Sequence, residues 1–183
     1  MVSNAQELDK QMLMELGADK LADLLLLHLR TLWTVDGLYF VNIEKAHGTE
    51  EATRIDADVW AVTGKIEARR LKEFLGIEGD ADLETAFRAN KLTGWALDLE
   101  GKEYSELQDG RCIIKNLECR IQNTRLSKGL GEFPCKRVRF GFLQAFYKEM
   151  NPNIHVECIH CPPDEHPEGV WCHWEISEKK GDE

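Results

Sequence analysis

The first hundred residues carry apolar side chains at helical spacing. Residues 18–47 are apolar over most of the helix circumference, and Gly48 then provides a helix stop. After Thr49, which we expect to cap the next helix, apolar residues recur three and four positions apart from Ala52 to Ile66. This spacing predicts a helix that continues to about residue 75. A further helix is predicted from residue 82 to about residue 97.

After residue 101 the pattern changes to that of β-strands. Residues 111–125 alternate, with Ile113 and Cys119 on one predicted face and polar residues on the other. Residues 104–107, before a Gln-Asp-Gly turn, are expected to pair with this strand. A helix over 135–150 and strands over 154–160 and 170–176 follow. The second half therefore predicts a β-β-α-β-β unit with an antiparallel sheet.

Together these patterns predict one α+β domain over residues 1–183, with a helical part, 1–100, and a cysteine-rich sheet part, 101–178. With 183 residues, 43% of them hydrophobic, the chain is long enough to form a core of its own. The longest apolar stretch, residues 21–43, is interrupted by charged residues such as Asp23 and Arg30. It therefore favours a buried helix over a membrane span. The polar N-terminus has no signal-peptide pattern, so we expect a cytoplasmic protein.

The net charge of −10 argues against nucleic-acid binding. Charge is not spread evenly, because residues 110–139 contain eight basic residues and only two acidic ones. Three interpretations are open for this basic stretch. It forms a solvated surface, it helps to bind a small anionic molecule, or it compensates the charge of nearby thiolates.

All six cysteines follow residue 111, and clustered cysteines in a cytoplasmic protein favour metal or thiol chemistry over disulfides. Cys158 and Cys161 form a C-x2-C knuckle, and Cys172 returns on the neighbouring predicted strand. Cys135, at a predicted helix start, is the expected fourth ligand, with Cys119 as the alternate. Zinc suits this donor set, and an iron–sulfur cluster is the alternative. Reversibly oxidised thiols and buried structural cysteines stay open.

Several polar residues are candidates for a small-molecule site. Asp36 lies in the apolar run LWTVDGLYF, where a carboxylate needs an ion-pair partner or serves as a ligand contact or proton carrier. Asp56, Trp60 and Glu67 share one stripe of their helix, which faces either solvent or a cleft. His160, inside the knuckle, is a candidate metal ligand or proton carrier. The predicted ligand-binding residues are Trp33, Asp36, Trp60, Glu67 and Arg69.

Several motifs resemble an uncharacterised family of small cytosolic bacterial and archaeal proteins. They are DGLYF, HG, DADVW, GKIEARRL, FPCK and the final C-x2-C-P…W-C-x-W, within residues 32–176. The ending more distantly resembles 4-vinyl reductase domains, which are small-molecule-binding α+β modules, and L-2-amino-thiazoline-4-carboxylate hydrolase-like proteins. The resemblance marks residues already singled out and implies no established reaction. Those residues are Asp36, Trp60, Glu67, Arg69, Cys135, Cys158, Cys161 and Cys172.

Three functions are compatible with these observations. The first is a binding or sensor module with a cysteine-ligated metal and a pocket for a small, anionic molecule. The second is a hydrolase acting on a small sulfur- or nitrogen-containing carboxylate, with Cys135 or a metal-bound water as nucleophile and Asp36 or His160 handling protons. The third is a structural or partner-binding protein, including a homodimer. Common nucleotide-binding and hydrolase motifs are missing from the sequence.

Overall fold

The computed structural model describes residues 4–179, and the chain divides into two compact units, residues 1–39 and 40–183. The first unit contains α1 (Asn4–Met14) and most of α2 (Ala18–His47). Among the described helices, α2 alone is long and apolar enough to cross a membrane by length and composition. The expected cytoplasmic location stays a prediction.

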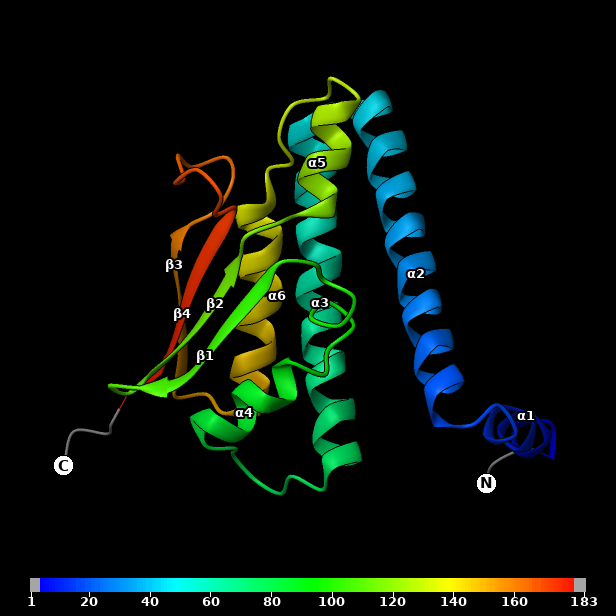
Figure 1. Cartoon of the computed structure of the whole chain (residues 1–183). Helices are drawn as coiled ribbons and strands as arrows, with labels where there is room; N and C mark the ends of the chain where they lie inside the picture. Colours follow the sequence, from blue (N-terminus) through cyan, green and yellow to red (C-terminus); the bar gives the residue numbers. More distant parts are fainter. Residues whose placement is uncertain (1–3, 180–183) are drawn as a thin grey trace. The chain divides into compact units, whose positions relative to one another are not determined.

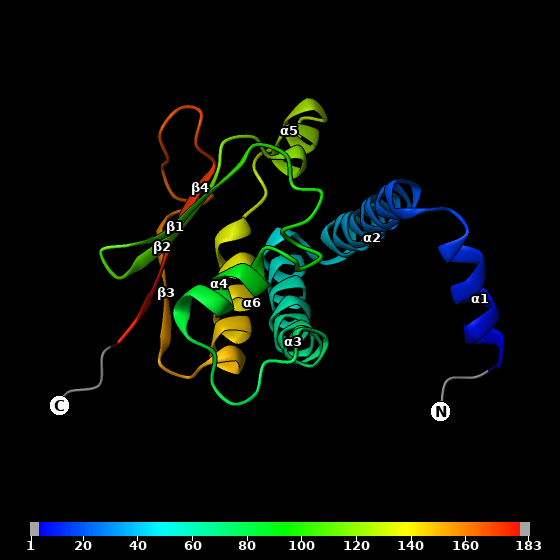
Figure 2. The same cartoon turned by 60° about the horizontal axis from the view of Figure 1, so that its bottom comes forward.

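The second unit begins at Phe40 and holds the sheet. Figures 1 and 2 show the sheet against α6, with α3 on the opposite side of α6. Its four antiparallel strands lie in the order β1-β2-β4-β3. The chain therefore has the predicted α+β class. In this unit the elements that follow α2 are α3 (Thr49–Leu75), α4 (Leu83–Asn90), β1 (Lys102–Gln108), β2 (Arg111–Asn116), α5 (Arg120–Ser127), α6 (Cys135–Met150), β3 (Ile154–His160) and β4 (Cys172–Glu178).

Helix boundaries follow local sequence signals closely. The α2 helix ends at His47, as predicted. The α3 helix ends at Leu75, and its C-cap, Gly76, adopts the left-handed conformation that glycine favours. Gly48, rather than Thr49, is the N-cap of α3. The Thr49 hydroxyl instead donates a 2.9 Å hydrogen bond to the Glu44 carboxylate.

The α3 and α6 helices approach closely at Gly64. A Cβ atom on Gly64 would overlap the backbone carbonyl of Phe142, so a larger residue could not occupy this position without a shift of one helix. The face of α3 that contacts the core includes Asp56 and Trp60, which are 8% and 6% exposed. The solvent-facing interpretation of the stripe is therefore wrong for Asp56 and Trp60, and the cleft-lining interpretation stays a prediction.

Some predicted elements are wrong. Residues 111–125 do not form one strand, because β2 ends at Asn116 and residues 120–127 form α5. The predicted helix over 82–97 is shorter, since α4 ends at Asn90 and turns follow. The apolar stripe of α3 is not its buried face, because Val59, Val62 and Ile66 are all more than 40% exposed. The second half is thus β-β-α-α-β-β.

Candidate functional site

Five of the six cysteines come from neighbouring ends of elements in the second unit. Cys135 begins α6, Cys172 begins β4, and Cys161 directly follows β3. Cys158 lies on β3 and Cys119 precedes α5. Strand parity correctly places Cys172 with buried Trp174 and Ile176. Cys112 is buried on β2, and its electrostatic neighbours include Glu84, Lys91 and Glu106.

The Cys161 thiol interacts with two of the other thiols. The Cys161 thiol is hydrogen-bonded to Cys135 and to Cys172, and these bonds raise the pKa of Cys161 far above its ordinary value. The same bond from Cys161 lowers the pKa of Cys172 to about 7. A helix start, a loop and a strand start therefore bring three sulfur atoms into contact.

Cys119 and Cys158 flank this trio. Burial raises the pKa of Cys119 to about 12 and that of Cys158 to about 11, and both thiols interact electrostatically with Cys135 and Cys172. They differ in their surroundings. Cys119 precedes α5, and the backbone N–H groups of Ile121 and Gln122 lie beside its sulfur, whereas Cys158 lies near the Lys136 ammonium group.

The loop that carries the knuckle is fastened to α6. The backbone N–H of Lys136 donates to the Pro162 carbonyl at 2.8 Å, and the Lys136 ammonium group pairs with Asp164 at 2.7 Å. Free N–H groups at a helix start usually need such acceptors. These contacts fix Cys161 beside Cys135. Within residues 4–179, no group of three or more His, Cys, Asp or Glu side chains is arranged so that it could hold a metal ion.

His160 points away from the thiols. A register shift between Cys158 and His160 pairs His160 with His173, and their rings lie 5.7 Å apart. His173 alternates with buried Cys172 and Trp174, so both histidines occupy the outer face of the sheet. Burial lowers the pKa of both.

The predicted ligand-binding residues do not form one group within either unit. Trp33 and Asp36 belong to the first unit, and the other three lie on α3 in the second. Trp60 packs edge-on against Trp95 at 4.4 Å, and Glu67 accepts a hydrogen bond from the Gly94 N–H. Arg69, in contrast, is 60% exposed and pairs with Glu149 at 2.6 Å.

A buried polar group that the sequence patterns did not single out lies on α6. Arg139 is 2% exposed and its guanidinium stacks over Trp95 at 4.6 Å and Phe142 at 5.5 Å. Arg139 precedes Phe142 and Phe146 by three and seven residues, so helical spacing already places it on the apolar face of α6. The sequence therefore contains a signal for this residue, a charged side chain on the apolar face of a helix.

All of these second-unit residues fall inside one family match. A family model described as "Family of unknown function (DUF6125)" matches residues 14–178. The chain belongs to this family. The match confirms the resemblance to an uncharacterised family, while the more distant resemblances to 4-vinyl reductase domains and to the hydrolase-like proteins are not shown by it. No curated protein matches the chain.

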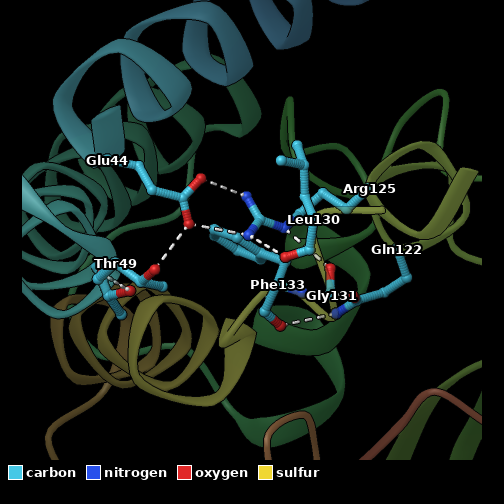
Figure 3. A network of polar contacts seen from close by, with 8 residues as sticks. Glu44, Thr49, Gln122, Arg125, Leu130, Gly131 and Phe133 are labelled. Carbon is cyan, nitrogen blue, oxygen red and sulfur yellow. Dashed lines mark hydrogen bonds and ion pairs between the residues drawn. The ribbon is translucent and has the colours of Figure 1, made fainter. Parts of the chain in front are cut away.

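A second polar network in this DUF6125 chain ties the end of α2 to α5 (Figure 3). Arg125 makes a two-pronged ion pair with Glu44, at 3.0 and 2.9 Å, and also donates to the carbonyls of Leu130 and Gly131. Gln122 exchanges two hydrogen bonds with the backbone of Phe133. Hydrogen bonding from Arg125 lowers the pKa of Glu44.

Much of the basic stretch is neutralised by such pairs. Arg111 pairs with Glu175, Arg120 with Asp98, Arg125 with Glu44 and Lys136 with Asp164. These four contacts favour a structural interpretation of the stretch. Arg139 is different, because it is buried and no ion pair links it to a carboxylate within the described chain.

Proposed function

We propose that this protein is a binding or sensor module in which a metal held by cysteine thiolates joins α6 to the sheet. The observation that carries the proposal is the contact of the Cys161 thiol with both Cys135 and Cys172. These three thiols come from separate segments, a helix start, a loop and a strand start. A tetrahedral zinc site places its sulfur ligands about 2.3 Å from the metal, which requires just such neighbouring sulfurs.

Cys158 is our choice for the fourth ligand. It completes the C-x2-C knuckle with Cys161, and its strand leads directly into the fastened loop. Cys119 stays the alternate ligand: it directly precedes α5, and its side chain makes no capping hydrogen bond to that helix. The proposed ligands are therefore Cys135, Cys158, Cys161 and Cys172. Zinc is the favoured metal, and the same thiolates suit an iron–sulfur cluster.

A site closed by four thiolates favours a structural or sensing role over hydrolysis. Catalytic zinc keeps one position for water, whereas four protein ligands occupy all tetrahedral positions. His160, the nearest candidate proton carrier in sequence, faces the outer side of the sheet. For the hydrolase alternative, only three of the cysteines would bind the metal, and a water molecule would take the fourth position. The Cys→Ser variants described below count the cysteine ligands and so test this alternative.

The test is metal analysis of protein purified without oxygen, together with its absorption spectrum. We expect one zinc per chain, or iron with sulfide and a brown colour for a cluster. Single Cys→Ser changes then assign the ligands. Cys135, Cys158, Cys161 and Cys172 variants should each lose metal, whereas Cys119→Ser should retain it.

Cys112→Ala is the matched control, because Cys112 is equally buried but lies elsewhere on the sheet. It should retain the metal even if it lowers stability. Protein with no metal and six thiols open to alkylation would refute the proposal. If Cys119→Ser loses the metal and Cys158→Ser retains it, the fourth ligand is Cys119 and not Cys158.

A further inference from the structure

Arg139 places a full positive charge inside the second unit. Its side chain is on α6, the residue is 2% exposed, and neither Nη1 nor Nη2 has a hydrogen-bond partner in the described chain. Moving such a cation out of water costs several kcal/mol even after the protein relaxes. A buried arginine therefore normally meets an anion.

The aromatic rings around Arg139 do not supply that anion. Trp95 and Phe142 face the guanidinium, and Trp60 packs against both rings. The two cation–π contacts offset only part of the cost of burying the charge. Glu67 interacts electrostatically with Arg139, but it accepts the Gly94 N–H instead of pairing with the guanidinium.

Other buried polar groups near Arg139 are also unpartnered. The hydroxyl groups of Tyr104 on β1 and Tyr147 on α6 have no hydrogen-bond partner in residues 4–179, and both interact electrostatically with Arg139. Native proteins leave few such atoms, so several in one region point to a common partner.

We propose that Arg139, with the Tyr104 and Tyr147 hydroxyls, binds a small molecule through its carboxylate. A guanidinium presents two parallel N–H donors that match the two carboxylate oxygens, and neutral hydroxyls can donate to the same oxygens. The rings of Trp95 and Phe142 would contact the apolar part of the molecule. This inference rests on the binding role proposed above and gives it a ligand class. Cys172, a proposed metal ligand, interacts electrostatically with Arg139, so metal content is measured beside carboxylate binding.

The test titrates the full-length protein with sodium acetate and sodium benzoate at constant ionic strength, against acetamide and benzamide as uncharged analogues. Thermal unfolding and calorimetry measure binding, and native mass spectrometry of the purified protein detects a molecule already bound. We expect the carboxylates, and not the amides, to raise the melting temperature. Alternatively, the purified protein carries a carboxylic acid that is released on unfolding.

Three variants separate this site from surface binding. Arg139→Gln should abolish the response, and Tyr104→Phe, which keeps the ring, should weaken the Kd about tenfold. Arg137→Gln is the matched control, since Arg137 is exposed on the same helix and should bind as the wild type does. If Arg139→Gln does not fold, the carboxylate affinity of Tyr104→Phe still tests the proposed site.

Two results would overturn the proposal. One is a wild-type protein that carries no bound acid and responds to carboxylates no more than to chloride. The other is an equal response in wild type and Tyr104→Phe. Metal content measured on the same samples keeps the two proposals apart: carboxylate binding without metal refutes only the metal centre, and metal without carboxylate binding refutes only this site.

Discussion

Gly64 shows how a single missing side chain sets the distance between α3 and α6. The Phe142 carbonyl occupies the space that a Cβ would need. Gly141, on the facing helix, is less confined, because a Cβ there would lie 3.5 Å from the Ala57 carbonyl and 3.6 Å from the Ala61 Cβ. These are ordinary van der Waals distances. Close packing of the two helices therefore requires glycine at position 64 but leaves room for a methyl group at position 141.

We predict that Gly64→Ala destabilises the protein by about 1–3 kcal/mol, because the helices must separate to admit the methyl group. Gly141→Ala should be neutral or stabilising by up to about 1 kcal/mol, since alanine favours the helix. Urea unfolding followed by circular dichroism measures both. Equal effects of the two changes would show that the close approach at Gly64 does not limit packing.

Residue patterns predicted part of the candidate site. Alternation along β4 is enough to place Cys172 inward and His173 outward, because that choice depends only on period two. It could not place His160, whose face is set by the register shift after Cys158. The lack of an ion-pair partner for Arg139 depends on which acids fold nearby, and no local pattern carries that information.

At the scale of elements, α5 is the main failure of the sequence pattern. Residues 111–125 alternate, yet the buried residues of α5 are Gln122 and Arg125, three positions apart. Both are polar, and they are buried because their hydrogen bonds go to Phe133, Leu130, Gly131 and Glu44. Hydrophobic periodicity cannot detect a helix whose inner face is polar. By contrast, α6 and β3, which bury apolar side chains, have the predicted bounds.

We predict that Arg125→Gln lowers stability by about 3 kcal/mol near neutral pH, since it leaves Glu44 without its main partner. Because the pKa of Glu44 is lowered in the folded protein, its ion pair stabilises the fold above the unfolded-state pKa of about 4.5. This contribution is lost as the pH falls through the lower folded-state pKa. The difference between wild type and variant should therefore shrink from pH 7 to pH 3.

Denaturant unfolding at several pH values measures this difference. Arg111→Gln is the control, because Arg111 is 61% exposed in its pair with Glu175 and should contribute less than about 1 kcal/mol. A gap between wild type and Arg125→Gln that stays constant down to pH 3 would contradict the role given to Glu44.

At the scale of the whole molecule, both proposed sites lie in the second unit. The buried apolar residues of the described chain begin at Phe40, and the cysteines and Arg139 come later in the sequence. Phe40 packs edge-on against Phe133 at 4.8 Å, and Glu44 follows one helical turn later. The sequence could not reveal this boundary, because it falls inside α2. Residues 18–47 are predicted to form one continuous helix, and they do so in the structure.

We therefore predict that a chain of residues 40–183 folds and keeps both its metal and its carboxylate response. A chain of residues 49–183 is the matched comparison, since it also lacks Phe40 and Glu44 and leaves Arg125 buried without its anion. It should be less stable by several kcal/mol. Circular dichroism, metal analysis and the acetate and benzoate titrations measure all three chains. If residues 40–183 fold but lose carboxylate binding, residues 1–39 are needed for binding, and Trp33 and Asp36 are the candidates. If these residues do not fold at all, the first unit contributes to the core, and the boundary at residue 40 does not separate independent folding units.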